Sequence, residues 1–309
     1  MGISGADRKM YDIIVAGAGT AGLTAALYGA RAGKRVLVLE QKNAGGQIVN
    51  SPEVDNYPGI KHISGFEFIQ GLQEQAEEAG AEFRYASAEA IRCEGEKKLV
   101  RCGDEELACN SIILATGMVY RKLGLEREEQ LTGKGVSYCA VCDGAFFREK
   151  DTAVVGGGNT ALEDALYLSE ICRKVWLIHR RDRFRGENAA VNRLLQTKNV
   201  EFILDSVVTQ FRGEEQLSGI IVKNRATGVV SELPVSGVFV AVGQMPENER
   251  FQDVVELDTH GYIKADESCR TSVPGIFAAG DCRTKQVHQL VTAAADGAVA
   301  ALAACGQTE

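Results

Sequence analysis

The sequence has 309 residues and a formal net charge of -8 at pH 7. This length is typical of two domains, each with its own hydrophobic core. The acidic balance disfavours binding to nucleic acid or to an anionic membrane surface, because both kinds of partner recruit an excess of Lys and Arg.

Signals of export and membrane insertion are missing from the sequence. Residues 1–9 have no apolar segment of the kind that a secretory signal needs. Residues 291–305 are rich in Ala but are too short to span a bilayer, so a buried helix is predicted there. The nine cysteines have irregular spacing, which indicates reduced thiols and a cytoplasmic protein.

The first predicted elements form a nucleotide-binding unit. Tyr11–Ala16 is an apolar run typical of a buried parallel strand, a helical stretch reaches Ala32, and the strand Val36–Leu39 ends on Glu40. Between strand and helix lies a G-x-G-x-x-G motif, in which small residues allow a tight turn and close approach of a pyrophosphate. An acid at the end of the second strand binds ribose hydroxyls, so FAD or NAD is expected. The predicted binding residues are Gly17, Gly19, Thr20, Ala21, Gly22 and Glu40.

Cys139 and Cys142 form the single CxxC pair of the sequence. This spacing lets two thiols cycle between dithiol and disulfide. A metal site is not predicted, because no second cysteine pair exists and the four histidines have no metal-binding spacing.

A second nucleotide-binding unit follows the cysteine pair. The strand Thr152–Val155 leads into a glycine loop, a helix to about Leu168 and the strand Val175–Ile178. A cationic run follows where the first unit has an acid, and guanidinium groups bind a 2′-phosphate where a carboxylate would repel it. The second unit is therefore predicted to bind NADPH. Its predicted binding residues are Gly156, Gly158, Asn159, Thr160, Ala161, His179, Arg180, Arg181 and Arg185.

A third element lies close to the C-terminus. Ile276–Asp281 is a short strand ending on an acid, with a helix predicted over Thr284–Ala304. Such a turn places Gly280 and Asp281 next to a flavin. The predicted fold is therefore α/β, with two Rossmann-like nucleotide-binding domains. The FAD domain is discontinuous (1–118 and 247–309), and the NADPH domain (119–246) is inserted in it and carries the CxxC pair.

Taken together, these motifs resemble the low-molecular-weight, bacterial-type thioredoxin reductases over essentially the whole chain. The most specific marks are the segment from Cys139 to Gly144, Asn159-Thr160-Ala161 and the run from His179 to Arg185. The resemblance adds further FAD-binding residues: Gln41, Gly45, Gly46, Gln47, Asn56, Ala115, Thr116, Gly117, His288, Gln289 and Leu290.

The resemblance also implies that both Rossmann-like domains are three-layer domains and that the protein is a homodimer. It further implies electron flow from NADPH through FAD to the Cys139–Cys142 disulfide, and from there to thioredoxin. In that family Cys142 is the cysteine nearer the flavin, Cys139 attacks the disulfide of the partner, and Asp143 is the acid. Both the nucleotide and the cysteine pair have to reach the same flavin. The middle domain is therefore expected to alternate between two orientations, about hinges near Met118–Lys122 and Gly243–Pro246. The glycine and proline of these segments suit an ordinary crossing between domains equally well.

Three departures from the family pattern are visible. His288 stands where relatives often have Arg, which makes the charge near the flavin pH-dependent. Cys282 follows Asp281 where an apolar residue is usual, and a small buried side chain is expected there. Ala145 stands where many relatives have another aromatic residue, directly before Phe146 and Phe147. These two phenylalanines are expected either to form part of a docking surface for thioredoxin or to be core aromatics.

Two other functions are compatible with these motifs. One is reduction of another disulfide carrier, peroxiredoxin-linked or glutaredoxin-like. The other is a flavin-bound redox sensor that binds a partner without turnover. The acid next to the CxxC pair favours turnover.

Overall fold

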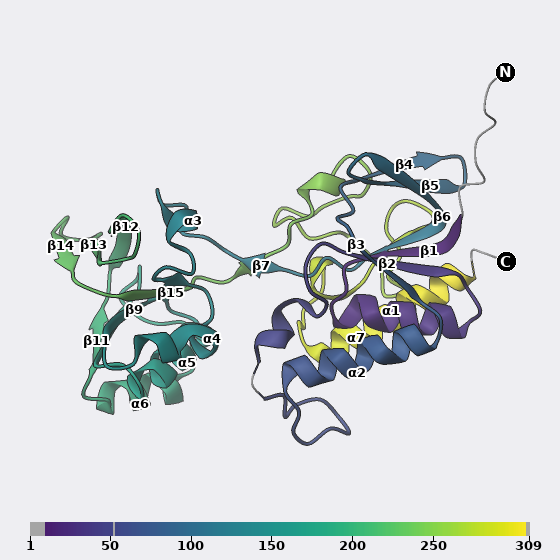
Figure 1. Ribbon diagram of the computed structural model, residues 1–309. Coiled ribbons are helices and arrows are strands. Elements are labelled where there is room, and N and C mark those ends of the chain that lie inside the picture. The colour runs from purple at the N-terminus through teal and green to yellow at the C-terminus, as the bar shows by residue number, and fades with distance from the viewer. Residues whose placement is uncertain (1–9, 52, 307–309) are drawn as a thin grey trace. The chain divides into compact units, whose positions relative to one another are not determined.

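The computed structural model describes residues 10–51 and 53–306 (Figure 1). The expectation that residues 1–9 contain no secretory signal lies outside this part. Two compact units are present: unit 1 runs up to Val119 and resumes at Met245, and unit 2 is Tyr120–Gln244. Which cofactor each unit holds is not decided by this division and stays a prediction.

Unit 1 is built on one sheet with the order β3-β2-β1-β6, extended on β6 by β17 and by the antiparallel pair β5-β4. Every pairing among β3, β2, β1, β6 and β17 is parallel. The strands are β1 (Tyr11–Ala16), β2 (Val36–Glu40), β3 (Glu82–Tyr85), β4 (Ala90–Glu94), β5 (Lys97–Cys102), β6 (Glu105–Leu114) and β17 (Ile276–Ala278).

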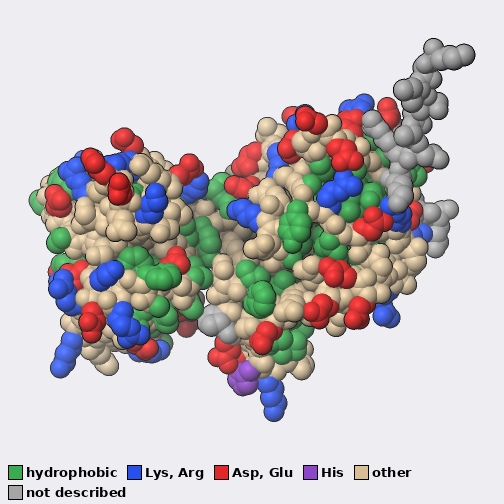
Figure 2. Space-filling view, viewed as in Figure 1, with side chains coloured by type: hydrophobic (Ala, Val, Ile, Leu, Met, Phe, Trp, Pro, Cys, Tyr) green, Lys and Arg blue, Asp and Glu red, His purple; other side chains and the backbone are tan. Residues whose placement is uncertain are grey.

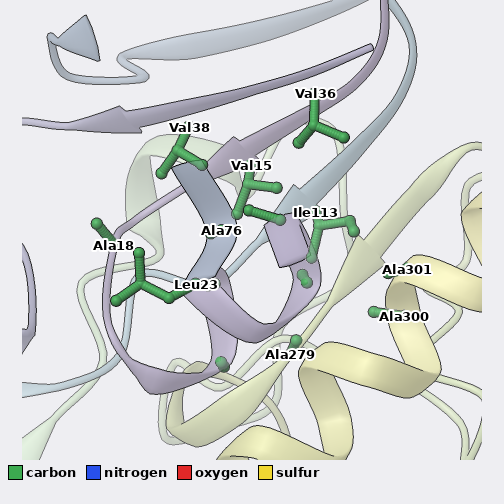
Figure 3. Close-up of a cluster of buried hydrophobic side chains, with 14 of the residues drawn as sticks. Val15, Ala18, Leu23, Val36, Val38, Ala76, Ile113, Ala279, Ala300 and Ala301 are labelled. Carbon is green, nitrogen blue, oxygen red and sulfur yellow. The ribbon is translucent and has the colours of Figure 1, made fainter. Parts of the chain in front are cut away.

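Three helices cover one face of this sheet: α1 (Thr20–Arg31), α2 (Gly65–Glu78) and α7 (Leu290–Cys305) (Figure 1). The core beneath them combines branched strand residues such as Val15, Val38 and Ile113 with alanines of α7 (Figure 3). The unit also contains three short 3-10 helices: η1 (Gly46–Asn50), η3 (Glu249–Phe251) and η4 (Gly280–Cys282).

Small residues let α7 pack closely against α1. A Cβ on Gly297 would overlap the carbonyl of Ala21, while Ala300, Ala301 and Ala304 are fully buried. The predicted helix over Thr284–Ala304 was wrong at its start, because Gln289 forms a capping box with Thr292 and the helix begins after it. Among the described helices, none has the length and apolar character needed to cross a membrane.

Unit 2 contains a parallel sheet with the order β11-β10-β9-β15-β8 and a separate antiparallel sheet, β12-β13-β14. The strands are β8 (Val136–Ser137), β9 (Asp151–Gly156), β10 (Lys174–Ile178), β11 (Val200–Ile203), β12 (Ser206–Arg212), β13 (Gly219–Asn224), β14 (Val230–Leu233) and β15 (Gly237–Ala241). The helical elements are α3 (Glu128–Leu131), α4 (Ala140–Asp143), η2 (Gly144–Phe147), α5 (Asn159–Ser169) and α6 (Asn188–Gln196).

The parallel sheet of unit 2 is covered on both faces. One core cluster joins it to α5 and α6, and another joins it to the antiparallel sheet. The predicted α/β class with Rossmann-like parallel sheets is confirmed, and both predicted strand-loop-helix-strand units are present. On the face drawn in Figure 2, basic and acidic side chains are interspersed, with no single-sign patch covering it.

The two crossings of the chain between the units are hydrogen-bonded to each other. β7 (Val119–Tyr120) pairs with β16 (Gln244–Met245), and the N–H of Arg121 donates to the carbonyl of Gly243 at 2.9 Å. These residues coincide with the two segments that the sequence suggests as hinges.

Candidate functional site

The first glycine loop joins β1 to α1 and is held by Glu40 at the end of β2. One carboxylate oxygen of Glu40 accepts the main-chain N–H of Ala18 and the other accepts that of Lys42, both at 2.9 Å. Charge-assisted bonds of this kind hold a loop in one conformation. Each carboxylate oxygen keeps acceptor capacity for a ribose hydroxyl.

The glycines of this loop have different tasks. Gly17 has a φ of +110°, and a Cβ there would overlap the carbonyl of Ala115. A Cβ on Gly22 would overlap the carbonyl of Gly17. A Cβ on Gly19 would meet only the carbonyl oxygen of Gly45, at an ordinary contact distance of 3.9 Å. Gly17 and Gly22 therefore serve the backbone packing, and Gly19 leaves room for a ligand at the start of α1, where no side chain caps the helix.

Segments distant in the sequence meet around this loop. The N–H of Gly45 donates to the carbonyl of Ala18 at 2.7 Å, and the Gln47 side-chain amide donates to the carbonyl of Met118 at 2.6 Å. Asn56 donates to the Gln289 side chain at 3.4 Å. The other predicted residues lie on the same unit: Gln41 directly after β2, Gly46 at the start of η1, Ala115, Thr116 and Gly117 after β6, and Leu290 at the start of α7.

A buried asparagine connects two of these segments. The Thr116 hydroxyl donates to Oδ1 of Asn248 at 3.0 Å. The Asn248 amide donates to the carbonyls of Gly261 and Cys282, at 2.9 and 2.8 Å. Asn248 thereby ties the end of β6 to η4, which carries Asp281. Nothing in the local sequence marks this residue, because its partners lie far away along the chain.

Asp281 and His288 face each other beside η4. Nδ1 of His288 lies 3.5 Å from Oδ1 of Asp281, and neither of these buried atoms has a hydrogen-bond partner. Burial raises the pKa of Asp281, while the nearby His288 and Lys285 side chains act in the opposite direction. The His288 ring also lies against Tyr262, with the ring centres 5.8 Å apart.

The neighbouring side chains around η4 form a buried ionic cluster. Asp296 accepts from Arg283 at 3.2 Å, from Lys285 at 2.8 Å and from the N–H of Gly280 at 3.0 Å. Gly280 itself has a φ of +78°. The cluster fixes the turn before Asp281. Cys282 is fully buried, so the expectation of a small buried side chain is confirmed.

These features of unit 1 fit FAD. The open face of Gly19 and the uncapped start of α1 suit a pyrophosphate, and Glu40 suits a ribose. Oδ1 of Asp281 is a buried acceptor without a hydrogen-bond partner, and a ligand hydroxyl would donate to it.

The second glycine loop joins β9 to α5 and is stabilised differently. The N–H groups of Arg185 and Gly186 donate to the carbonyl of Gly157, at 2.7 and 3.2 Å. The His179 ring packs so closely on Gly157 that a Cβ there would overlap it. His179 is only 5% exposed, and burial lowers its pKa. His179 is therefore a neutral ring that packs against the loop and supports it.

The remaining predicted residues of this loop differ in burial: Gly156 and Ala161 are buried, whereas Asn159 and Thr160 are exposed. A Cβ on Gly156 would overlap the carbonyl of Ala241, whereas Gly158 has open space beside it. The Asn159 side chain accepts from the N–H of Glu187 at 2.8 Å, so it closes the loop. Thr160 and Ala161 form the first turn of α5, which has no side-chain cap.

The arginines after β10 are solvent-exposed. Among the described residues, no acidic side chain pairs with Arg180, Arg181 or Arg185, whereas Arg183 lies 3.7 Å from Asp182. Guanidinium groups presented in this way bind phosphate through charge-assisted bonds. The second loop therefore fits a nucleotide with an additional phosphate.

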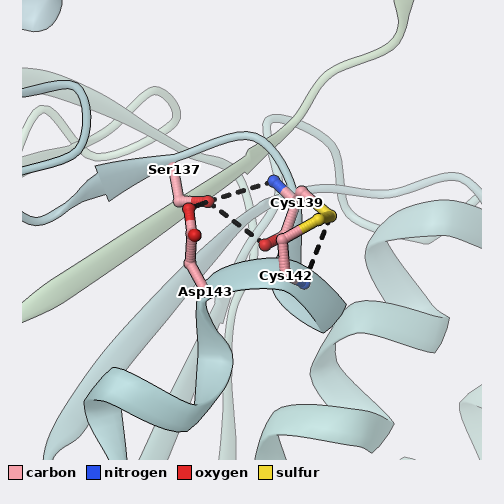
Figure 4. Close-up of a disulfide and its surroundings, with 4 residues drawn as sticks. All are labelled: Ser137, Cys139, Cys142 and Asp143. Carbon is pink, nitrogen blue, oxygen red and sulfur yellow. Dashed lines mark hydrogen bonds between the residues drawn. A yellow bond between two sulfur atoms is a disulfide. The ribbon is translucent and has the colours of Figure 1, made fainter. Parts of the chain in front are cut away.

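Cys139 and Cys142 form a disulfide at the start of α4 in unit 2 (Figure 4). Their Cα atoms are 5.4 Å apart, and Sγ of Cys139 accepts the N–H of Cys142 at 3.3 Å. Cys142 is exposed and Cys139 is half-buried within the unit. The predicted redox pair is therefore assembled and partly accessible.

Ser137 positions the third predicted catalytic residue, Asp143. The Ser137 hydroxyl donates to Asp143 at 2.7 Å and accepts the N–H of Cys139 at 3.1 Å (Figure 4). The sequence contains only a weak signal for this role, namely a Ser on the strand directly before the cysteine pair. The hydrogen bonds fix the carboxylate beside the disulfide.

Tyr138 anchors the other side of the cysteine segment. Its hydroxyl donates to the buried carboxylate of Glu128 at 2.8 Å, and its ring stacks on Tyr120. Burial raises the pKa of Tyr138, and the hydrogen bond to Glu128 raises it further. Glu128 also accepts the N–H groups of residues 123–125. The residue before Cys139 is thus held on a rigid loop.

The two phenylalanines after the CxxC pair are in different environments. Phe146 is 73% exposed, whereas Phe147 packs edge-on against the buried Phe239. One is therefore a surface aromatic and the other belongs to the core. No group of three or more His, Cys, Asp or Glu side chains suited to a metal ion is found in the described residues.

Comparison with known proteins gives consistent matches along nearly the whole chain. The profile of the pyridine nucleotide-disulphide oxidoreductases matches residues 11–298. A thioredoxin reductase of Listeria monocytogenes is 43% identical over 295 residues, covering 95% of this chain and 92% of the relative. A thioredoxin reductase of Bacillus subtilis is 39% identical over 296 residues, covering 96% and 94%.

Solved structures give the same result. The thioredoxin reductase of Lactococcus lactis matches with a TM-score of 0.87 and 41% identity, over 96% of this chain and 98% of that one. The thioredoxin reductase of T. acidophilum matches with a TM-score of 0.85 and 34% identity, over 97% and 99%.

Proposed function

The chain belongs to the pyridine nucleotide-disulphide oxidoreductase family, and we propose that it is an NADPH-dependent thioredoxin reductase that contains FAD. The observation that carries this proposal is the Cys139–Cys142 disulfide with Asp143 beside it, in the same unit as a glycine loop followed by unpaired arginines. A homodimer is a part of the proposal that rests on the resemblance, and a cytoplasmic location is a part that rests on the irregular spacing of the cysteines.

Each unit holds one nucleotide in this proposal. Glu40 and the first glycine loop bind the adenosine half of FAD, with Asp281 on the ribityl or phosphate side. The second glycine loop binds NADPH, and Arg180, Arg181 and Arg185 bind its 2′-phosphate. FAD, when bound, relays two electrons from the nicotinamide to the disulfide.

The cysteines carry out the thiol-disulfide exchange. Two electrons and two protons open the Cys139–Cys142 bond to two thiols. The Cys139 thiolate attacks a sulfur of oxidised thioredoxin, forms a mixed disulfide and displaces one thioredoxin thiolate. The Cys142 thiolate then attacks Sγ of Cys139, which releases dithiol thioredoxin and restores the starting disulfide. Asp143, held by Ser137, exchanges the protons. The sum is NADPH, one proton and oxidised thioredoxin converted to NADP⁺ and reduced thioredoxin.

Phe146 supplies a surface for the protein substrate. An exposed aromatic side chain four residues from Cys142 offers an apolar contact beside the reacting sulfurs. Phe147 is excluded from this role because its ring packs against Phe239.

Alternation of the two units completes the proposal. The segments Met118–Lys122 and Gly243–Pro246 would carry the change in orientation. A covalent cross-link between the units is expected to spare one half-reaction and to abolish steady turnover. Full turnover of the cross-linked enzyme would contradict the alternation.

An anaerobic titration followed by absorbance tests the function. We expect NADPH to bleach the bound flavin and oxidised thioredoxin to restore the colour over repeated cycles. Restoration by a glutaredoxin-like carrier, but not by thioredoxin, would identify a different disulfide substrate. A single stoichiometric bleaching without turnover would favour a redox sensor.

A further inference from the structure

The turn between β13 and β14 contacts the arginine segment that follows β10. The N–H of Arg225, in this turn, donates to the carbonyl of Asp205 at 2.6 Å. The N–H of Asp205 in turn donates to the carbonyl of Arg181 at 3.1 Å. The antiparallel sheet of unit 2 is therefore tied to the end of the parallel sheet.

The Arg225 side chain makes a second contact with the same segment. Its Nη1 donates to the carbonyl of Arg180 at 3.0 Å. The guanidinium group has five N–H donors, so further donors remain at this exposed position. Arg225 thus brings positive charge next to the main chain of a predicted phosphate-binding residue.

The turn that carries Arg225 is itself well fixed. The Asn224 side chain accepts the N–H groups of Ala226 and Thr227, at 3.0 and 2.9 Å. The same side chain donates to the carbonyl of Leu204 at 3.4 Å. A long side chain on a fixed turn loses less conformational entropy when it forms a hydrogen bond.

The position of the arginines depends on such main-chain contacts. The strand β10 ends at Ile178, and none of the described acidic side chains pairs with Arg180 or Arg181. The carbonyls of His179 and Arg181 are held by the main-chain N–H groups of Ser206 and Asp205. The carbonyl of Arg180 is held by the Arg225 side chain.

We propose that Arg225 is a positioning residue for the 2′-phosphate site: its guanidinium holds the main chain of Arg180 and adds positive charge beside a dianionic phosphate. This inference rests on the proposed use of NADPH. The acids close to the site are Asp182, which lies beside Arg183, and Asp205, whose main chain bonds to Arg225. Because NADH lacks the 2′-phosphate, its binding does not depend on Arg225.

Three variants of the full-length, FAD-loaded protein separate the contribution of the positive charge of Arg225 from that of its hydrogen bond to Arg180. Arg225→Ala removes both the charge and the hydrogen bond. Arg225→Gln removes the charge but keeps an N–H donor. Lys223→Ala removes one charge from the same hairpin without contact to Arg180, and it is the matched control.

The measurements are KM and kcat for NADPH and for NADH, and the Kd of 2′,5′-ADP and of 5′-AMP. For Arg225→Ala we expect KM for NADPH and Kd for 2′,5′-ADP to rise about three- to tenfold, the range for one exposed charge-assisted hydrogen bond. The kcat values, KM for NADH and Kd for 5′-AMP should stay within about twofold. Arg225→Gln should give an intermediate loss, and Lys223→Ala should resemble the wild type.

Equal losses toward 2′,5′-ADP and 5′-AMP would assign Arg225 a merely structural role and overturn the inference. The same would follow if Arg225→Ala behaved like Lys223→Ala while the wild type preferred 2′,5′-ADP. A wild-type protein that binds both probes equally would instead contradict the proposed use of NADPH, and with it this inference.

Discussion

The two glycine loops have the same backbone plan and opposite electrostatic character. In unit 1 the residue at the end of the second strand is Glu40, and its carboxylate bonds to the N–H of Ala18 in the loop. In unit 2 the corresponding residue is His179, a buried ring that packs on Gly157. One loop is therefore held by hydrogen bonds to a charged carboxylate, and the other by a packed neutral ring together with main-chain hydrogen bonds to the carbonyl of Gly157.

This contrast indicates which residues are expected to set the nucleotide preference of each loop. An acid that bonds to the first loop also repels a phosphate placed at that position. A neutral ring under the second loop leaves the charge to the exposed arginines beyond the strand. We therefore expect the preference to be set by the residues at the end of the second strand and directly after it, and not by the glycines, which do similar work in both loops.

The largest expected effect comes from removing the cysteines while both loops stay intact. Cys139→Ser and Cys142→Ser should each lower thioredoxin reduction by at least about 1000-fold, because thiol-disulfide exchange needs both sulfurs. Bleaching of the flavin by NADPH should persist in both variants. Stopped-flow absorbance measures the two half-reactions separately, and normal thioredoxin reduction by Cys139→Ser would overturn the cysteine roles.

Reversing one charge at the second loop tests the electrostatic contrast directly. Arg181→Glu should raise KM for NADPH about 100-fold, because a phosphate contact is replaced by repulsion. KM for NADH should change less than about twofold. Arg183→Glu is the matched control, since Arg183 lies beside Asp182. Similar KM changes in the two variants would show that general surface charge sets the preference.

Substitutions at two glycines of the second loop are expected to separate an effect on stability from an effect on NADPH binding. A Cβ on Gly156 would overlap the carbonyl of Ala241, so Gly156→Ala should lower the free energy of unfolding by about 1–3 kcal/mol. Gly158→Ala adds its methyl to open space and should leave unfolding unchanged while weakening NADPH binding. Denaturant unfolding and nucleotide titration of both variants check this assignment, and a stability loss in Gly158→Ala would refute it.

The smallest expected effect concerns a carboxyl group on α5, the helix that follows the second loop. Burial raises the pKa of Asp164 to about 7. The folded state therefore binds more protons than the unfolded state between the ordinary carboxyl pKa and about 7, so its stability falls as the pH rises through that window. Asp164→Asn should stabilise the protein by about 1 kcal/mol at pH 8 and hardly at all at pH 4. Thermal unfolding at the two pH values gives the answer, and an equal change at both would contradict the raised pKa.

Local pattern was sufficient for most elements near the two loops. The predicted strand Tyr11–Ala16 agrees with β1, and Val36–Leu39 ending on Glu40 agrees with β2. These segments are predictable because an apolar run buried in a parallel sheet and a glycine loop are both local features. The start of α7 was placed too early, because residues 284–289 form an irregular connection that no Gly or Pro marks in the sequence.

Contacts between distant residues were not predictable. Asn248 joins Thr116 to Cys282, and Arg225 reaches Arg180 across 45 positions of sequence. Neither residue lies in a motif. Their partners become neighbours only after the sheets have formed.

Residue types and short spacings were enough to predict the chemistry of this protein: a cysteine pair able to cycle between dithiol and disulfide, one loop followed by an acid and one loop followed by arginines. Those properties depend on residue type and short spacing, which the chain displays without folding. Folding established which side chains position the cysteine pair and the two loops. It placed Glu40 on its own loop, His179 beneath the other loop, Ser137 on Asp143 and Arg225 on Arg180, because hydrogen bonds and packing between separate strands exist only in the folded chain.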